Sequence, residues 1–451
     1  MDKDPTLNTA IWTVAFADFS IVDTITKITD EDGYVGHYVR KSTPLLDAVA
    51  KGVGYAGQDL SKGVFFDSGN NAYVKNGTNI QYMFNGTNTD DNDVVRIGDL
   101  QAILEEYTRY KVDDLYITLN TVNPATTLGY AIFDDVSPNP REYEVENGVN
   151  FYIKEKCKGI IAIGGGSPMD CAKGIGIVVT NGKNILDFEG VDKIERAIPP
   201  MIFIPTTAGT ASEVSQFTII TNSTEKVKKA IISKSIVPDI ALIDPETTIT
   251  MDTYLTACTG IDALVHAFEA YVSNVASPVT DLHAIEAIRN VYEYLPKVIK
   301  EPQNINYRGK MLYASLEAGL AFSNAILGAV HSMAHSLGGF LDLPHGECNA
   351  LLLNHVVNFN YSAREEKYDN ILREWGIKMG MMTGENRKKT MFDIISELKL
   401  NVGIDKTLSK AGVKKKDIPV LSEKAVKDPC MATNPREATL KDVENIYEES
   451  L

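Results

Sequence analysis

The sequence predicts an α/β domain with a parallel sheet, an all-helical C-terminal domain after it, and an atypical strand-rich N-terminal region before it. Three observations support this fold class. After about residue 131, apolar strands alternate with glycine turns and helical stretches, as in a parallel sheet with crossover connections. After about residue 245 only long helical patterns remain. The earliest part of the chain is rich in Asn, Asp, Thr and Gly, which favour strands and turns over helices.

The N-terminal region, residues 1–130, is a separate part of the chain by its composition. It carries 10 Lys and Arg against 18 Asp and Glu, half of the net charge of −16. The string NGTN occurs at Asn76–Asn79 and again at Asn85–Asn88, with apolar and polar residues alternating in between. Asn-Gly supplies the positive φ angles of tight hairpins. We therefore expect a small meander around 64–95.

Before the α/β pattern, the spacing of apolar residues predicts a helix over 100–107 and a strand over 115–119. That strand could be the start of the next domain. Residues 158–178 predict a buried strand, a glycine-rich turn and a helix, and residues 197–215 repeat that order. The last strand pattern lies within 239–248. The helical patterns that follow cover 252–274, 279–299, 308–326, 329–341 and 389–399.

Two turns of the α/β region could bind a ligand. In Gly164–Ser167, three glycines end a strand and lead into a helix N-terminus, where a pyrophosphate would fit. A tight strand-to-helix connection explains these glycines equally well. The second turn, Pro205–Glu213, places small hydroxyl side chains at the carboxyl end of a strand, where parallel sheets bind ligands. Its alternative role is helix capping by Thr210 or Ser212.

The histidines are the most informative residues. His331, His335 and His345 fall within 15 residues, and His266 follows Asp262 by four positions. On a helix, residues four apart share a face. A single buried histidine is more commonly a hydrogen-bonded core residue, but several at ligand-like spacings favour binding. Carboxylate and imidazole groups suit a divalent transition metal, so we expect a site for Fe²⁺ or Zn²⁺.

Other candidate residues receive structural interpretations. Glu213 and Glu269 occupy positions where a helix would expose a solvated acid. The thiols nearest the motifs have no basic neighbour in sequence that would lower their pKa, so packing is expected of Cys171, Cys258 and Cys348. Ordinary surface or core roles are expected of His37, His283 and His355.

Composition excludes several classes of protein. A net charge of −16 argues against phosphate-tracking nucleic-acid binding. No apolar run of about 18 residues indicates a membrane span, and the beginning of the chain lacks signal-peptide features. The five cysteines are widely spaced, which favours reduced thiols. We expect a soluble, cytoplasmic protein with neither nucleic-acid nor membrane partners.

Four segments carry a resemblance to a known family: GGGSPMDCAK, PTTAGTASE, DALVHAFEAY and HSMAHSLGGFLDLPHGECNA. They resemble the signatures of the iron-containing, metal-dependent (group III) alcohol dehydrogenases, over about residues 131–451. The resemblance implies an α/β dinucleotide-binding domain at 131–245, a helical metal-binding domain at 246–451 and an active site between them. Residues 1–130 resemble no part of the family and look like a replacement or insertion.

The resemblance also implies roles for single residues. Asp262, His266, His331 and His345 match the metal ligands, and His335 matches the histidine that helps to move protons beside the metal. The family positions that contact the NAD or NADP cofactor are matched in this chain by nine residues: Gly164, Gly165, Gly166, Ser167, Asp170, Thr206, Thr207, Thr210 and Lys228. The family's TDxG-like ribose turn has no aligned counterpart, because the similar string Thr29–Gly33 lies too far before the glycine turn.

The implied reaction is interconversion of primary alcohols and aldehydes by hydride transfer to or from the nicotinamide. The metal would act as a Lewis acid, and His335 with water would carry the proton. Expected partners are a small alcohol or aldehyde and, as in relatives, further copies of the chain in a homodimer or larger homo-oligomer.

Two alternatives stay open. Without the usual start of the nucleotide domain, the dehydrogenase body could be catalytically impaired and act as a structural or partner-binding component through residues 1–130. A polyol dehydrogenase or a dehydroquinate synthase relative would carry a similar glycine loop. The Asp262–His266 pair and the Pro-His-Gly string at 344–346 favour the alcohol dehydrogenase branch over both of these relatives.

Overall fold

The structure is a computed structural model that describes residues 129–451, except 226 and 342, together with seven earlier strands. These strands are β1 (Trp12–Ala15), β2 (Thr26–Thr29), β3 (Val35–Tyr38), β4 (Lys62–Phe66), β5 (Ala72–Asn76), β6 (Asn79–Tyr82) and β7 (Tyr116–Thr121). The chain forms two compact units. The first contains the described residues of 1–206, 212–225 and 229–247, and the second contains those of 207–211, 226–228 and 248–451.

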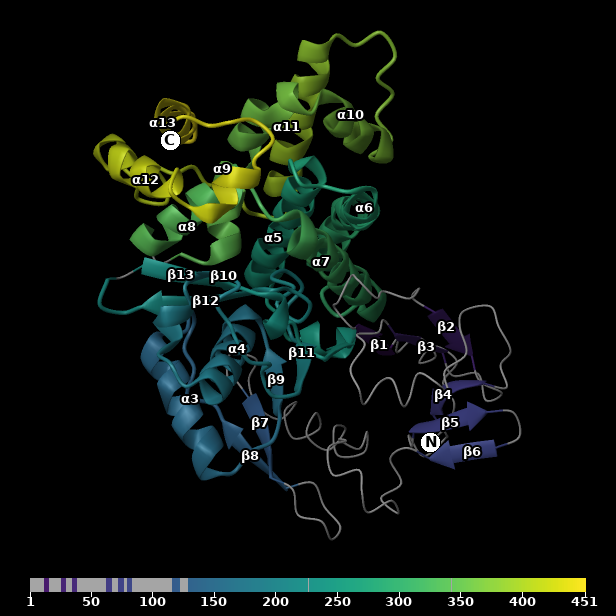
Figure 1. Ribbon diagram of the computed structural model, residues 1–451. Coiled ribbons are helices and arrows are strands. Elements are labelled where there is room, and N and C mark those ends of the chain that lie inside the picture. Colours follow the sequence, from purple (N-terminus) through teal and green to yellow (C-terminus); the bar gives the residue numbers. More distant parts are fainter. Residues whose placement is uncertain are drawn as a thin grey trace. The chain divides into compact units, whose positions relative to one another are not determined.

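The main sheet of the first unit has eight strands in the order β2-β3-β1-β14-β11-β9-β7-β8 (Figure 1). Its later strands are β8 (Gly129–Phe133), β9 (Ile160–Gly164), β11 (Met201–Pro205) and β14 (Ile240–Ile243). Strand β11 pairs in parallel with both β9 and β14. On the outer side of these three strands, β7 pairs with β9 and β1 pairs with β14, both in antiparallel orientation. The predicted parallel sheet is therefore confirmed for its central strands, and the strand expected over 115–119 is β7.

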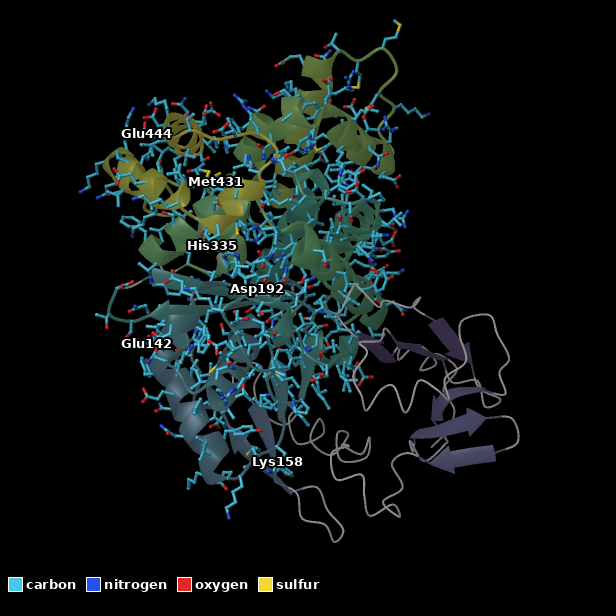
Figure 2. The ribbon with its side chains drawn as sticks, viewed as in Figure 1. Glu142, Lys158, Asp192, His335, Met431 and Glu444 are labelled. Atoms are coloured by element: carbon cyan, nitrogen blue, oxygen red, sulfur yellow. The ribbon has the colours of Figure 1, made fainter. Side chains whose placement is uncertain are left out.

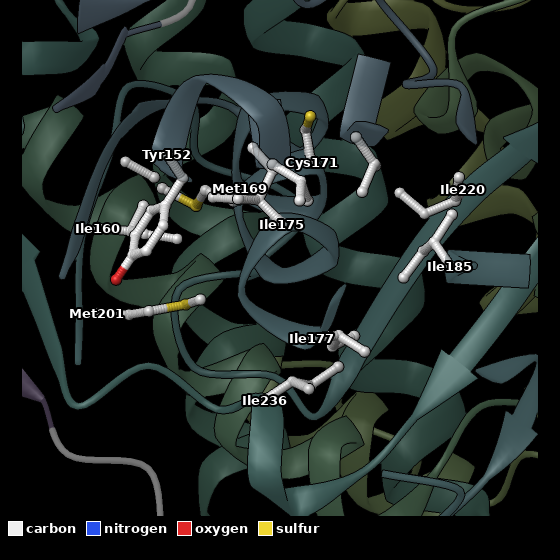
Figure 3. Close-up of a cluster of buried hydrophobic side chains, with 14 of the residues drawn as sticks. Tyr152, Ile160, Met169, Cys171, Ile175, Ile177, Ile185, Met201, Ile220 and Ile236 are labelled. Atoms are coloured by element: carbon white, nitrogen blue, oxygen red, sulfur yellow. The ribbon is translucent and has the colours of Figure 1, made fainter. Parts of the chain in front are cut away.

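Helices α3 (Glu142–Lys154) and α4 (Gly166–Asn181) pack against each other beside the sheet. Between them and the strands lies a core of apolar side chains, including Ile160, Cys171, Ile175 and Met201 (Figure 3). Strand β9 is buried along its whole length, which matches its unbroken apolar sequence. Each fully buried Ile or Met here stabilises the fold by about 1.5–3 kcal/mol relative to exposure.

The glycine turn between β9 and α4 requires glycine at one position. Gly164 has a φ of +154°, and a Cβ atom there would lie 2.4 Å from Cγ of Pro168. Gly165 is the N-cap of α4, and the helix begins at Gly166. The predicted order of strand, turn and helix is confirmed over 158–178.

The second predicted strand-turn-helix unit is only partly right. Strand β11 is present, but residues 206–216 form turns and contain no helix. Lys173 of α4 explains this, because its buried Nζ donates hydrogen bonds to the carbonyl oxygens of Ser215 and Phe217, 2.8 Å from each. With no helix to cap, Ser212 Oγ instead donates to Asp170 Oδ1 at 2.9 Å.

Two further three-stranded sheets are formed mainly by residues of the first unit. One has the order β10-β13-β12 and consists of β10 (Gly190–Val191), β12 (Phe217–Asn222) and β13 (Val227–Ile232). The other is the antiparallel sheet β4-β5-β6, in which Asn76 pairs with Asn79 across a two-residue connection. This confirms a meander at the first NGTN string. The second string, the helical spacing over 100–107 and residues 30–33 lie outside the described residues.

The second unit is helical. Its longer helices are α5 (Thr253–Val272), α6 (Pro278–Lys300), α7 (Ile305–Ala325), α8 (Ala329–Leu341), α9 (His345–Asn360), α10 (Glu365–Glu374), α11 (Gly384–Asn401), α12 (Ile418–Ala425) and α13 (Leu440–Glu449). Helices α5, α6 and α7 pack on one another, and α9 packs on α5 and α8. The predicted all-helical region is confirmed. Its pattern did not predict α9, which is buried on almost every side and so lacks amphipathic periodicity.

Helices of the described part of the chain are all too short or too polar to cross a bilayer.

Candidate metal centre

Helix α5 positions the first two candidate ligands. Asp252 caps its N-terminus by accepting a hydrogen bond from Leu255 N–H at 2.7 Å, and the helix then continues without a break to Val272. Asp262 and His266 are one turn apart on the same face, and both are buried. The predicted pairing of these two side chains on one helix face is therefore present.

Helices α8 and α9 bring two more imidazoles to this face. His331 lies in the first turn of α8, and His345 is the first residue of α9, directly after the N-cap residue Pro344. Asp262 Oδ1 is 4.0 Å from His331 Nε2 and 3.9 Å from His345 Nε2. With His266, each of the four residues offers one ligand atom, and all of these atoms lie within 4.8 Å of one another. This spacing fits ligands of one metal ion.

Hydrogen bonds fix the orientation of two rings. His266 Nδ1 is 3.1 Å from the carbonyl oxygen of Gly209, and His331 Nδ1 is 2.6 Å from Glu269 Oε2. A carbonyl oxygen can only accept, so Nδ1 of His266 carries the hydrogen and Nε2 keeps its lone pair. Gly209 reaches the ring because it has no side chain, since a Cβ there would lie 2.8 Å from Thr259 O on α5.

Burial controls the charge of the cluster. It lowers the pKa of His331 and His345 well below the usual value for histidine, and neighbouring imidazoles lower both further. It also lowers the pKa of His266, against the opposing effect of Asp262. Burial raises the pKa of Asp262, while His266 acts in the other direction. The imidazoles are thus neutral near pH 7, which is the state that binds metals.

An amide from α9 faces the same point. Asn349 Nδ2 donates to Asp262 Oδ1 at 2.6 Å and lies 3.2 Å from His331 Nε2 and 3.3 Å from His345 Nε2. Its Oδ1 is buried and has no hydrogen-bond partner among the described residues. A carboxylate and imidazole lone pairs converging in a buried space repel one another unless a positive group lies among them. The donor set therefore fits a divalent cation.

His335 lies beside the four-residue cluster rather than in it. It is on α8 (Figure 2), and its ring stacks on that of His345 with the centroids 5.3 Å apart. Its Nδ1 is 2.8 Å from Asp428 Oδ2, and Asp428 Oδ1 accepts the backbone N–H of Cys430 at 2.9 Å. Burial raises the pKa of Asp428, but His335 and the Cys430 N–H outweigh burial and hold it below the usual value. Asp428 is thus an ionised partner of His335.

The structure corrects the interpretation of two acids. Glu213 and Glu269 were expected to be solvated, but only 2% and 4% of their surfaces are exposed. Glu213 lies in a turn instead of a helix, and burial raises its pKa to about 7. Glu269 contacts His331. Its position three residues after His266 could have indicated this role, because it extends the face that carries the two candidate ligands.

The residues assigned ordinary roles behave as expected where they are described. Burial raises the pKa of Cys171, Cys258 and Cys348, and all are free thiols inside the protein. His283 pairs with Glu317 on α7, away from the metal cluster. The His37 side chain lies outside the described residues.

The predicted cofactor-binding residues divide between the two units. In the first unit, Gly164 to Ser167 and Asp170 lie at the β9–α4 turn, and Thr206 follows β11. Asp170 accepts from Ser212 Oγ and from Ile219 N–H, so it also holds this unit together. Thr206 Oγ1 is buried without a hydrogen-bond partner in the described chain. Thr207, Thr210 and Lys228 belong to the second unit, where the Lys228 charge lowers the pKa of Asp262 and His345.

Comparison with known families matches nearly all of the chain after residue 115. The profile described as iron-containing alcohol dehydrogenase matches residues 116–245, and that of the Fe-containing alcohol dehydrogenase family, C-terminal, matches residues 256–451. The first match begins with β7, about 15 residues before the start expected from the motifs.

Characterised relatives share about two fifths of the aligned residues. Alcohol dehydrogenase 4 of Schizosaccharomyces pombe is 43% identical over 337 residues, 75% of this chain and 79% of that protein. The 1,3-propanediol dehydrogenase of Citrobacter freundii is 41% identical over 319 residues, 71% of this chain and 82% of that protein. The NAD-dependent methanol dehydrogenase of Bacillus methanolicus is 40% identical over 324 residues, 72% of this chain and 85% of that protein.

Solved structures show the same similarity. A crystal structure of a 1,3-propanediol oxidoreductase aligns with a TM-score of 0.70 at 40% identity, covering 71% of this chain and 84% of that one. The alcohol dehydrogenase from Oenococcus oeni aligns with a TM-score of 0.72 at 33% identity, covering 79% of this chain and 89% of that one.

Proposed function

The chain belongs to the iron-containing alcohol dehydrogenase family, and on this basis we propose that it interconverts primary alcohols and aldehydes with a divalent metal ion and NAD or NADP. Membership makes it an alcohol oxidoreductase and implies a metal and a nicotinamide cofactor. The alternative, an impaired body used for structure or partner binding, gains no support from these relatives. Assembly into a homodimer or larger homo-oligomer stays a prediction.

We assign the metal to Asp262, His266, His331 and His345. The single observation that carries the proposal is the convergence of their four ligand atoms within 4.8 Å, with three of the four residues buried and His345 partly buried. Carboxylate and imidazole groups suit both Fe²⁺ and Zn²⁺, and either ion there would supply a Lewis acid that polarises the substrate oxygen. The chain's own part is to keep the three rings neutral and Asp262 directed at the same point.

The cofactor residues are proposed from the family motifs. Gly164 lets the chain turn tightly into α4, so that backbone N–H groups at Gly165, Gly166 and Ser167 are available to a pyrophosphate. The unpartnered hydroxyl of Thr206 supports a contact with a polar ligand. Asp170, Thr207, Thr210 and Lys228 complete the proposed set. The nicotinamide itself would supply hydride acceptance and donation.

His335 is proposed to move the proton that accompanies hydride transfer. Its Nδ1 is directed at the ionised Asp428, so Nδ1 carries the hydrogen and Nε2 is left able to accept or release a proton. The side chain next to it is His345, one of the proposed ligands. This arrangement supports a role for His335 as a proton carrier beside the proposed metal centre. Substrates are proposed to be small alcohols and aldehydes, the class named by the relatives.

The first prediction tests the reaction and the ligands together. Purified protein reloaded with Fe²⁺ or Zn²⁺ should oxidise NADH or NADPH when it is given short aldehydes, followed by absorbance of the reduced nicotinamide. His266→Ala should reduce kcat/KM by about 100-fold or more, because second-shell changes alone cost roughly 10- to 100-fold at metal sites. The control, His283→Ala, alters a histidine outside the cluster and should keep wild-type turnover.

Two outcomes would oppose the proposal in different ways. Full activity of His266→Ala with bound metal would remove His266 from the ligand set. Absence of turnover by the metal-loaded wild type, with both nucleotides and the whole aldehyde panel, would contradict the proposed reaction.

A further inference from the structure

Glu269 links the two helices that carry the proposed ligands. It lies on α5, seven residues after Asp262 and three after His266, on the same face of the helix. Its carboxylate is buried, and both of its oxygens contact residues of α8. Oε1 accepts the backbone N–H of Val330, and Oε2 lies against Nδ1 of His331, each at 2.6 Å.

The first of these bonds caps a helix. Backbone N–H groups in the first turn of a helix have no partner within the helix, and a buried one must find an acceptor elsewhere. At the start of α8, Val330 N–H uses Glu269, and Ala329 N–H uses Asn434 Oδ1 at 3.1 Å. Gly328 leaves room for both acceptors, since a Cβ there would lie 3.0 Å from each. Glu269 therefore fixes where α8 begins relative to α5.

The second bond selects one form of the His331 ring. A carboxylate oxygen accepts in this contact, so Nδ1 of His331 carries the hydrogen and Nε2 keeps its lone pair. That Nε2 is the atom 4.0 Å from Asp262 Oδ1. The ring form that Glu269 selects is thus the form that binds a metal through Nε2.

We propose that Glu269 is a positioning residue of the metal centre, which caps α8 and holds His331 in the form with a free Nε2. This inference rests on the proposed function, because it assumes that His331 is a ligand. Metal affinity then depends on Glu269 as well as on the four proposed ligands. Catalysis by Glu269 itself is not part of the proposal.

Replacement of Glu269 by glutamine separates the two forms of the ring. Glutamine has nearly the same shape but only one acceptor oxygen. Because Val330 N–H can only donate, it takes that oxygen, and the amide NH₂ then faces Nδ1 of His331. The ring must accept there and carry its hydrogen on Nε2, where it points at the cluster and blocks a metal bond.

The test measures metal affinity rather than activity. Zn²⁺ and Co²⁺ would be titrated into metal-free protein against a competing chelator. Glu269→Gln should bind each ion about 10- to 100-fold more weakly than the wild type. Circular dichroism should show the same helix content in both proteins.

Two control variants separate the possible causes. Glu317→Gln changes the other buried glutamate that faces a histidine ring, His283, and should leave metal affinity unchanged. Asn434→Ala removes the cap at Ala329 without touching His331, and should weaken metal binding less than Glu269→Gln does. Equal losses of metal affinity in Asn434→Ala and Glu269→Gln would contradict the ring-selection part of the proposal.

A measurement on the wild type keeps the inference testable if Glu269→Gln fails to fold. Nitrogen-15 NMR of histidine-labelled, metal-free protein should show His331 with its hydrogen on Nδ1. A hydrogen on Nε2, or wild-type affinity in a folded Glu269→Gln, would overturn the inference alone. Failure of the wild type to bind either ion at this cluster would overturn both this inference and the proposed function.

Discussion

At the scale of residues, the partners of the ring nitrogens distinguish the histidines of the second unit. His266 and His331 each have Nδ1 held by an acceptor, and His345 presents Nε2 to Asp262. His335 is held in the same way by Asp428 but lies beside the cluster. The spacing of the histidines predicted a cluster. It did not predict the residues that hold the rings. Gly209 and Asp428 are distant from the histidines in the sequence, and Glu269, three residues after His266, was interpreted as a solvated acid.

Asp428 provides the test at this scale. Its two oxygens accept from Cys430 N–H and His335 Nδ1, so Asp428→Asn leaves one acceptor for two donors. Cys430 N–H can only donate, which forces the amide NH₂ towards His335. We expect kcat to fall by roughly 10- to 100-fold, less than the roughly 100- to 10,000-fold that acid–base catalysis contributes, because His335 itself is kept. Metal affinity should stay unchanged.

Steady-state kinetics and metal titration of the same preparation check this expectation. Wild-type kcat in Asp428→Asn at full metal content would show that His335 needs no carboxylate partner. An equal loss of kcat and metal affinity would place Asp428 in the support of the metal cluster instead.

At the scale of elements, the start of α9 depends on contact with α5. Gly346 follows the proposed ligand His345, and a Cβ on it would lie 2.2 Å from the carbonyl oxygen of Cys258. Glu347 in the same turn accepts hydrogen bonds from Tyr254 on α5 and from Lys406, the latter at 2.7 Å. The Pro-His-Gly string therefore serves close packing, and we propose that it also supplies a ligand.

Gly346→Ala tests this close approach. The added methyl must push α9 away from α5, which we expect to lower the free energy of unfolding by about 1–3 kcal/mol, as overpacking does, and to weaken metal binding. Gly339→Ala on α8 is the matched control, because a Cβ there meets nothing within 4 Å. It should be neutral or more stable by about 0.5–1 kcal/mol.

Urea unfolding and metal titration of both variants give the comparison. A stable Gly346→Ala protein with wild-type metal affinity would contradict the idea that contact between α9 and α5 sets the position of His345.

At the scale of the whole molecule, the sequence predicted those strands, turns and helices that a local pattern of residues encodes. The central parallel strands, the β9–α4 turn and the helices α5 to α8 have recognisable local sequence patterns, and the structure contains them. The expected helix after β11 was wrong, because Lys173 binds the carbonyl oxygens of that segment from another element. Such long-range contacts leave no local pattern. The family match from residue 116 likewise began earlier than the motifs indicated.

The central claim is that Asp262, His266, His331 and His345 hold one divalent ion. Anomalous diffraction from crystals of the Zn²⁺-loaded protein, recorded on both sides of the zinc absorption edge, tests it most directly. We predict one strong peak at about 2.0–2.2 Å from a carboxylate oxygen of Asp262 and from one nitrogen of each histidine. A peak elsewhere, or none at this cluster in fully loaded protein, would contradict the account.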